Sequence, residues 1–158
     1  MIQHLTRKQL DVSKYDYCIE NSMQSRMYAF SWYLDLVTDN WDVLVLNDYE
    51  GVMPIPWRRK FFIKYVYPPF WMLELGVFSL KESMELVPFF EVLMDQFRFI
   101  ESRLNTANNP SKTSQYLLSK EMQVLSLAPD YDVIVKNFRK DRQKDLARAT
   151  TSDRKSVV

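Results

Sequence analysis

The sequence predicts an α+β protein with a mainly antiparallel or mixed central sheet flanked by helices. Three observations lead to this class: short helical patterns near the start of the chain, four extended apolar segments in its middle, and a helical pattern followed by more extended segments. The chain has 158 residues, of which 47% are apolar and 26% charged, a balance typical of folded proteins. This length is sufficient for one core. We therefore expect a single domain over residues 1–149, with a polar tail or a truncation at 150–158.

Two short helices are expected within the first ~40 residues, from their apolar spacing and from residues that cap helices. Ser13 is suited to cap the first helix, which carries Tyr15, Cys18 and Ile19 on its apolar face. Ser31 opens the second helix or lies within it. The pattern around these two helices gives the first 30 residues a helical character.

Extended structure is expected from Trp41 onward. The apolar run 41–46 and the segment 52–57 are separated by turn residues at 47–51, which predicts a hairpin. Two further extended segments, 61–67 and 72–78, follow in order. The four segments together predict a meander.

The second strand of this hairpin has two features that constrain its position. Pro54 and Pro56 cannot donate hydrogen bonds to a neighbouring strand, so the strand lies at an edge or presents these positions away from a partner. Arg58, Arg59 and Lys60 follow in a segment expected to connect two strands. Three adjacent cations in a connection are either solvated or hold a phosphate or carboxylate.

The second half of the chain is expected to alternate helix and strand. Ser79 and Glu82 have the spacing of a capping box, which predicts a following helix. Pro88 would disrupt an interior turn, so the regular part of this helix is expected to begin near Leu86. The remaining expected elements are a strand, a polar loop, a strand or tight pair of strands, and a last helix, over residues 97–104, 105–112, 116–127 and 131–149.

The sequence contains no readable catalytic centre. His4 is the sole histidine, which argues against a Ser-His-Asp relay and a histidine-based metal site. Cys18 is the sole cysteine, and its apolar surroundings are more typical of core packing than of a nucleophile. Gly51 and Gly76 are the only glycines, too few for a P-loop or a dinucleotide fingerprint, and their scarcity also argues against a coenzyme A pyrophosphate site. We therefore expect no catalytic residue, metal site or cofactor site in this chain.

The charge balance gives no global preference for an anionic partner. Lys and Arg number 21 against 20 Asp and Glu, so we do not expect a nucleic-acid partner. There is no apolar leader after Met1 and no apolar run near 18 residues. The sequence therefore predicts a cytoplasmic protein with no membrane partner.

One aromatic segment stands out as a candidate binding site. Tyr67, Phe70 and Trp71 surround the rigid pair Pro68 and Pro69 between two expected strands. Such a concentration of aromatic faces suits the packing of a sugar, a peptide or a neighbouring domain. The alternative interpretation, a capped end of the sheet, stays open.

The last expected helix combines an apolar stripe with basic residues. The stripe consists of Tyr131, Ile134, Val135, Phe138, Leu146 and Ala149. Arg142 falls on this stripe, and Lys144 is one of several cations around it. An arginine in such a position either reaches water past the end of the core or occupies an anion site completed by structure beyond residue 158.

The order of these features resembles the N-acyltransferase group that includes the Fem family of peptidoglycan aminoacyl transferases and related two-domain GNAT proteins. The resemblance spans nearly the whole chain and is carried by segments 28–34, 41–45, 52–58, 75–79 and 131–149. Its most specific part is the stretch FRKDRQKDLARA at 138–149, which looks like the basic helix that closes the first half of those proteins.

The resemblance implies a GNAT-like fold and a role on the acceptor side of a cleft. In that family two GNAT-like halves pack together and the first half contributes acceptor contacts, which would place Arg142, Lys144 and Trp32 toward the cleft. The donor, an acyl-CoA or an aminoacyl-tRNA, would require the second domain. The chain would then be inactive alone, with a second GNAT-like domain or a partner chain as its partner and an amine or peptide as acceptor.

Two other functions are compatible with the same residues. The main alternative is a non-catalytic binding module, possible also as a homodimer, that docks a partner through its aromatic surface. A weaker alternative makes the basic last helix a tRNA contact, which would show a steep salt dependence.

Overall fold

The computed structural model describes residues 1–82, 84–108, 121 and 124–152. It divides the chain into two compact units, Met1–Tyr116 and Leu117–Val158, which are described separately. The boundary lies inside the stretch expected to form one domain, and that expectation stays a prediction.

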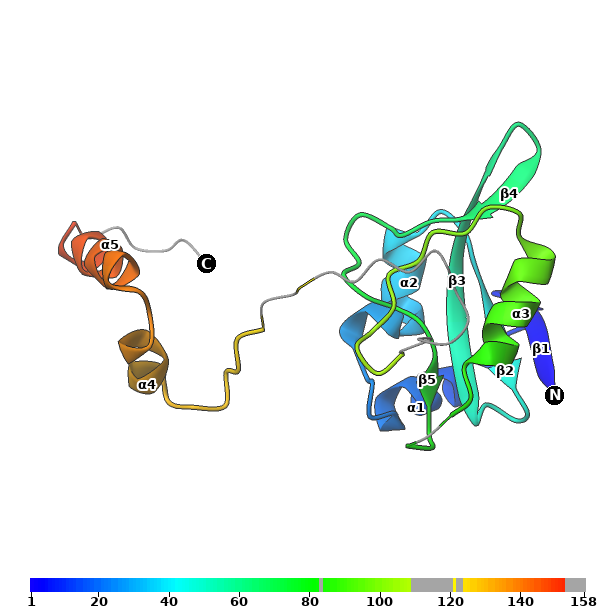
Figure 1. Ribbon diagram of the computed structural model, residues 1–158, viewed down its shortest axis with the longest axis horizontal. Helices are drawn as coiled ribbons and strands as arrows, with labels where there is room; N and C mark the ends of the chain where they lie inside the picture. The colour runs from blue at the N-terminus through cyan, green and yellow to red at the C-terminus, as the bar shows by residue number, and fades with distance from the viewer. Residues whose placement is uncertain (83, 109–120, 122–123, 153–158) are drawn as a thin grey trace. The chain divides into compact units, whose positions relative to one another are not determined.

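The first unit contains an antiparallel sheet, which confirms the α+β class and the antiparallel arrangement (Figure 1). Within the described part of the unit, the strands follow the order β1-β2-β3-β4, and β5 pairs with β3. Their bounds are β1 Ile2–Thr6, β2 Trp41–Leu46, β3 Gly51–Lys60, β4 Ile63–Val66 and β5 Phe78–Ser79.

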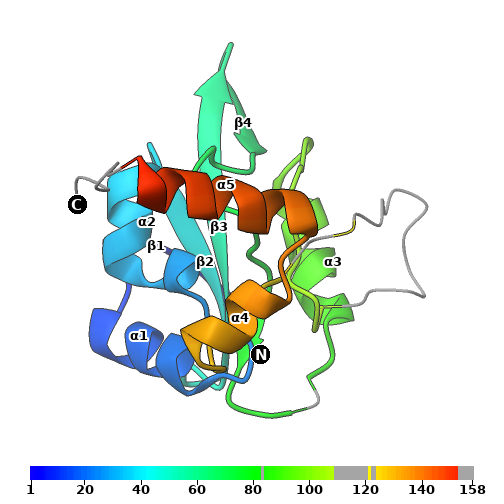
Figure 2. The same ribbon diagram turned by 90° about the vertical axis from the view of Figure 1, so that its left-hand side faces the viewer.

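Helices cover both faces of this sheet (Figures 1 and 2). The helices are α1 Val12–Asn21, the short 3-10 helix η1 Met27–Ala29, α2 Ser31–Val37 and α3 Val87–Gln96. Side chains of β2 alternate between the two sides, since Val43 and Val45 pack in the core with α1 and α2, whereas Leu44 packs with Phe89 and Leu93 of α3. The sheet is therefore the middle layer of three.

The hairpin of β2 and β3 confirms the expected strands at 41–46 and 52–57, and it also explains the prolines. Pro54 lies opposite Val43 and Pro56 opposite Trp41, so both occupy a strand that is paired with β2. Among the described strands, β3 pairs elsewhere only through its two ends, with β5 and with β4. The carbonyl of Pro56 accepts from Tyr67 N, so the hydrogen-bonding side of this residue points away from β2. The prolines therefore present their backbone nitrogens away from β2, which is the second of the two arrangements expected for them.

Three expectations for the first 60 residues are wrong. Ile2–Thr6 forms β1, where helical character was expected, because it pairs with β2 from Ile2 opposite Leu46 onward. Asp11, not Ser13, caps α1, since its side chain accepts from Lys14 N. Residues 58–60 belong to β3 and do not connect strands, because the chain reverses two residues later.

The expected strand at 72–78 is also wrong for most of its length, because only its last residue enters β5. Gly76 has a φ of 113°, a conformation that L side chains rarely adopt. Asn108 replaces a strand partner there: its Oδ1 accepts from Val77 N at 2.5 Å and its Nδ2 donates to Val77 O at 3.0 Å. Residues 97–104 likewise form no strand and contribute only isolated bridges at Ile100 and Leu104.

The expected capping box forms no helix start. Ser79 Oγ accepts from Lys81 N, and α3 begins only at Val87 with Pro88 in its first turn. This start confirms the expectation that the proline delays the regular helix to near Leu86. Half of the expected loop at 105–112 and most of the expected strand at 116–127 lie outside the described residues.

In the described part of the second unit, the single helix expected at 131–149 is replaced by two, α4 Tyr131–Lys136 and α5 Lys140–Thr151. Arg139 is extended, with ψ at 148°, which ends the first helix before the second begins. Gln143 Nε2 donates to the carbonyl oxygens of Val135, Lys136 and Phe138, so it satisfies acceptors that the break exposes. In the described parts of both units, no helix has the length and apolarity to cross a membrane.

Candidate binding surface

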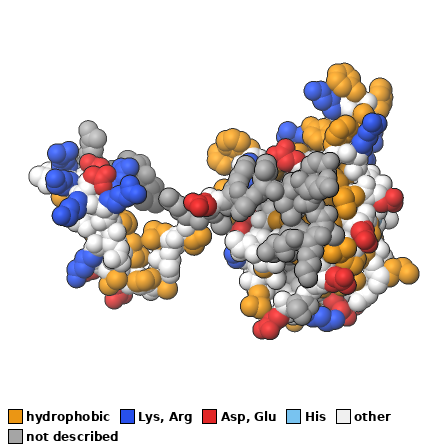
Figure 3. Space-filling view, viewed as in Figure 1, with side chains coloured by type: hydrophobic (Ala, Val, Ile, Leu, Met, Phe, Trp, Pro, Cys, Tyr) orange, Lys and Arg blue, Asp and Glu red, His pale blue; other side chains and the backbone are white. Residues whose placement is uncertain are grey.

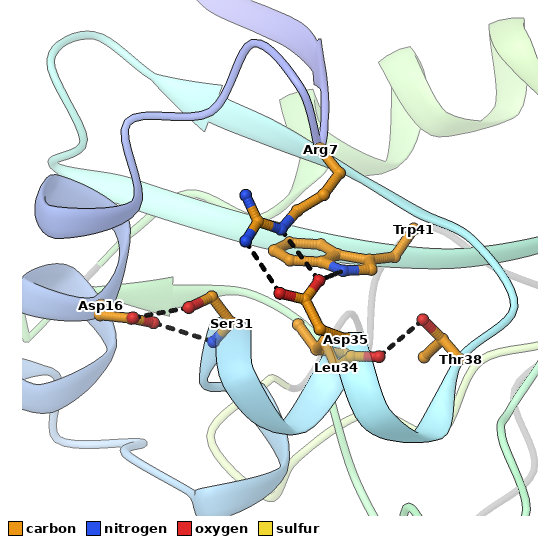
Figure 4. Close-up of polar contacts among 7 residues, drawn as sticks. All are labelled: Arg7, Asp16, Ser31, Leu34, Asp35, Thr38 and Trp41. Carbon is orange, nitrogen blue, oxygen red and sulfur yellow. Dashed lines mark hydrogen bonds and ion pairs between the residues drawn. The ribbon is translucent and has the colours of Figure 1, made fainter.

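The position of α2 is set by hydrogen bonds from two other elements. Asp16 of α1 accepts from Ser31 N at 2.8 Å and from Ser31 Oγ at 2.6 Å, which caps the first turn of α2 (Figure 4). At the other end of the helix, Thr38 Oγ1 donates to Leu34 O. The helix is short, and these contacts fix the direction in which its side chains project.

A second polar group ties α2 to the sheet (Figure 4). The Asp35 carboxylate accepts from Arg7 Nε at 2.9 Å, from Arg7 Nη2 at 2.8 Å and from Trp41 Nε1 at 2.9 Å. The hydrogen bonds from Arg7 lower the pKa of Asp35, and the one from Trp41 adds to this effect. Asp35 is thus an ionised structural residue that holds α2 against β2.

The aromatic surface consists of Tyr28, Trp32, Tyr33, Phe70 and Trp71. The Tyr33 ring packs edge-on against Tyr28 and Trp32 at centroid distances of 5.7 and 5.6 Å. Its hydroxyl donates to the Trp71 carbonyl at 2.7 Å, and Phe70 packs edge-on against Trp71 at 5.0 Å. Tyr33 therefore joins α2 to the loop after β4, and it brings Trp32 together with the expected pair Phe70 and Trp71.

The outer members of this surface are open to solvent. Trp32 is 51% exposed, Trp71 69% and Phe70 84%. Large aromatic side chains exposed side by side are characteristic of surfaces that bind partners.

Tyr67 has a different environment from the other aromatic candidates. It is half-buried, its ring lies 4.2 Å from the Arg58 guanidinium carbon, and its hydroxyl accepts from Asp39 N at 3.5 Å. Arg58 also pairs with the Asp39 carboxylate, and this hydrogen bond raises the pKa of Arg58. Tyr67 therefore anchors the base of the β3–β4 hairpin.

Two hollows of the first unit are small, and only the first of them adjoins a candidate aromatic residue. One next to Tyr67 has about 10 Å³, lined among others by Pro56, Pro69 and Arg103, which is room for about one water. Another has about 180 Å³ and is lined among others by Gln24 and Arg26. Pockets that enclose drug-sized ligands have roughly 300–1,000 Å³.

Arg142 and Lys144 lie on α5 in the second unit, and both are exposed. Arg142 Nη1 lies 3.6 Å from Asp145 Oδ2, one turn along the same helix, a contact of little energetic weight at a surface. Arg142 is therefore exposed to solvent, which is compatible with both arrangements expected for it. The structure brings together three of the expected site residues, Trp32, Phe70 and Trp71.

The nucleophile and base candidates are engaged in packing. Cys18 is buried, and burial raises its pKa to about 11, so the thiol is protonated at neutral pH. His4 Nε2 lies 3.1 Å from Asp42 Oδ2 between β1 and β2, and its ring packs edge-on against Phe97. In the part of the chain that the structure describes, no cluster of three or more His, Cys, Asp or Glu side chains has the arrangement of a metal site.

Sequence reasoning missed the roles of three aromatic residues, Tyr33, Phe61 and Phe62. Tyr33 was part of the family resemblance, but its role as the link to Trp71 depends on a contact between residues 38 positions apart. Phe61 and Phe62 were expected to begin a strand but form the tip of the β3–β4 hairpin. The signal available for them was the pair of aromatic residues between Lys60 and Lys64.

Comparisons of this chain with protein-family models, curated proteins and solved structures find no match. The resemblance to GNAT-type acyltransferases stays a prediction.

Proposed function

We propose that the first unit is a binding domain that docks a peptide or a protein segment through the aromatic surface. The observation that supports this proposal is the exposure of Trp32, Phe70 and Trp71 by more than half on two segments joined through Tyr33. Exposed aromatic side chains provide large contact areas at a low cost in conformational entropy, and they are enriched at the energetic centres of interfaces.

The size of the hollows favours an extended partner over a small ligand. A ligand that relies on enclosure needs a cavity larger than the hollow of about 10 Å³ beside Tyr67. A peptide or protein instead gains affinity by covering exposed rings, as the aromatic surface allows.

The aromatic surface is also held in place before any partner binds. Asp16 caps α2, Tyr33 bonds to the Trp71 carbonyl, and Pro68 with Pro69 restricts the backbone beside Phe70. Such preorganisation lowers the entropy lost on binding.

The second candidate function is the acceptor-side domain of an N-acyltransferase with a GNAT-like fold, supported by the family resemblance. In that case the aromatic surface contacts an amine or peptide acceptor or a second GNAT-like domain, and an acyl-CoA or aminoacyl-tRNA donor binds to that second domain. The chain of residues 1–158 should then show no acyl transfer with acetyl-coenzyme A or a charged tRNA, and measurable turnover would refute this role as an inactive half.

The binding proposal can be tested with peptides selected from a random displayed library on the immobilised chain. Trp71→Ala should weaken the selected peptides about 10- to 100-fold, the range of an interface hot spot. The bond from Tyr33 survives this substitution, because it is made to the backbone carbonyl of residue 71. The matched control is Phe61→Ala with Phe62→Ala, which removes rings elsewhere that are more exposed than Trp71. Unchanged affinity in Trp71→Ala, or an equal loss in the control, would contradict the proposal.

A further inference from the structure

The β3–β4 hairpin projects beyond the rest of the first unit (Figure 1). Its strands pair from Trp57 opposite Val66 to Lys60 opposite Ile63, so Phe61 and Phe62 form the turn. Phe61 is 81% exposed and Phe62 94%. The apolar side chains at the tip therefore make almost no contribution to the core.

Basic residues follow directly behind this apolar tip, where Figure 3 shows them beside hydrophobic side chains. Lys60 lies one residue from the turn, and Arg59 faces Lys64 on the next pair along the hairpin. Lys64 Nζ lies 4.0 Å from the Trp57 ring centre. No Asp or Glu occurs between Gly51 and Leu73, so the hairpin has no carboxylate of its own.

The turn holds its aromatic residues at a cost to the backbone. Phe61 has a φ of 46° and Phe62 a φ of 68°, and both therefore lie in the left-handed region. A two-residue hairpin turn of this kind favours Asn-Gly, and bulky residues there are strained. Such strain at an exposed position indicates that the side chains serve a role other than folding.

We propose that the hairpin tip inserts into the surface of an anionic lipid bilayer. Phe61 and Phe62 enter the boundary between headgroups and acyl chains, and the neighbouring cations contact lipid phosphates. At about 3.3 Å per residue the cations lie roughly 3–7 Å behind the turn. This spacing matches the ~5–10 Å depth to which interfacial segments bury their apolar face.

Aromatic residues further along the hairpin fit the same order. Tyr65, which faces Arg58, and Trp57, which faces Val66, lie behind the cations. Tyr and Trp are enriched at headgroup level in membrane proteins. Along the hairpin, the apolar tip is followed by cations and then by amphipathic rings. This order follows the polarity gradient of a bilayer surface.

Other partners fit this arrangement less well. A second copy placed tip to tip would bring two sets of Arg59, Lys60 and Lys64 together, and like charges repel. A single-stranded nucleic acid could contact the cations through its phosphates. Its bases, however, stack on rings that line a groove, whereas Phe61 and Phe62 lie at the end of a projecting hairpin. The proposal revises the expectation of no membrane partner, which rested on the lack of apolar runs long enough to span.

The test is flotation of the full chain with large unilamellar vesicles of phosphatidylcholine alone or with 30 mol% phosphatidylserine. Binding is expected to the phosphatidylserine vesicles and to fall as the salt concentration rises from 0.1 to 1 M, because the screening length shrinks from ~10 to ~3 Å. Lys60→Gln and Lys64→Gln should each weaken binding about fivefold.

The decisive variant pairs Phe61→Asn with Phe62→Gly, which removes the apolar tip but suits the turn. It should bind phosphatidylserine vesicles at least about tenfold more weakly while remaining folded. The control is Phe70→Ser with Trp71→Ser, which removes exposed rings of the aromatic surface and should bind as wild type. Phe70 and Trp71 belong to the surface of the proposed docking function, whereas Phe61 and Phe62 do not. The two proposals can therefore fail separately.

Three results would overturn the inference. They are no binding of the wild-type chain to phosphatidylserine vesicles, an equal loss in the control pair, and unchanged binding in Phe61→Asn with Phe62→Gly. A concentration-dependent dimer or RNA complex that depends on the tip in the absence of vesicle binding would assign the hairpin to those partners.

Discussion

Relieving the strained turn of the β3–β4 hairpin should raise the free energy of unfolding. Phe61 and Phe62 have φ values of 46° and 68°, and the left-handed conformation costs an L-residue about 1–2 kcal/mol. Because both side chains are exposed, replacing them loses no buried area. A new glycine costs about 0.5–1 kcal/mol in unfolded-state entropy. The contact of Lys60 over the Phe61 ring, at 5.7 Å, is worth about 0.5–1 kcal/mol at an exposed site. Phe61→Asn with Phe62→Gly should therefore stabilise the chain by about 1–2 kcal/mol.

Urea unfolding followed by tryptophan fluorescence measures this gain as a higher midpoint with an unchanged slope. The matched control is Phe61→Ala with Phe62→Ala, which removes the rings but leaves two L-residues with Cβ atoms in the left-handed region. It should not raise stability, and it should lose at most about 0.5–1 kcal/mol, the worth of the Lys60 contact. A double Asn-Gly variant no more stable than wild type, or an alanine pair that gains as much, would refute the strain argument.

Three other side chains give predictions that test the packing around the candidate surface. Asp35→Asn should cost about 1 kcal/mol at pH 7, because the neutral amide has one acceptor oxygen and can no longer accept both hydrogen bonds from Arg7. Since the folded-state pKa of Asp35 is lowered, its stabilisation is present above the unfolded value of about 3.9 and is lost as the pH falls below it. The wild-type and Asp35→Asn stability curves, measured by urea unfolding, should thus converge toward pH 3. Cys18, with its pKa raised to about 11 by burial, should react with a thiol reagent at pH 8 only as fast as the protein opens, and rapid labelling of the native chain would contradict this. Gly76→Ala should cost about 2–4 kcal/mol in urea unfolding, because the φ of 113° is strained for alanine and the new Cβ meets the Asn108 amide, and a loss below 1 kcal/mol would contradict this.

The sequence was informative where local pattern and tertiary packing agree. The apolar run of β2, the turn residues after it and the extended start of β3 were predicted because each carries its own strong local signal. The late start of α3 followed from the steric limits of Pro88. β1 was missed because Ile2–Thr6 is short and partly polar, and its strand character comes from pairing with residues some 40 positions later.

The candidate site was predictable in composition but not in assembly. Phe70 and Trp71 were identified because they flank a rigid diproline, whereas their association with α2 depends on the bond from the Tyr33 hydroxyl to a backbone oxygen. The turn at Phe61 and Phe62 was misplaced because the usual turn formers are absent there. The break between α4 and α5 was missed for a related reason, since Gln143 satisfies exposed carbonyl groups that local propensity does not reveal.

The base of the hairpin links the two surfaces proposed for the first unit. Arg58 pairs with Asp39, just before β2, and its guanidinium lies over the Tyr67 ring, just before the loop that carries Phe70 and Trp71. The base of the hairpin is held chiefly by the backbone hydrogen bonds of Val66 with Phe99 and Glu101, and the exposed Arg58–Asp39 pair adds to them only modestly. A partner docked on the aromatic surface would then keep a defined orientation relative to a bilayer that holds the tip. Arg58 differs from Arg59 and Lys60 because it pairs with Asp39, whereas on the membrane proposal the charges of Arg59 and Lys60 would contact lipid phosphates.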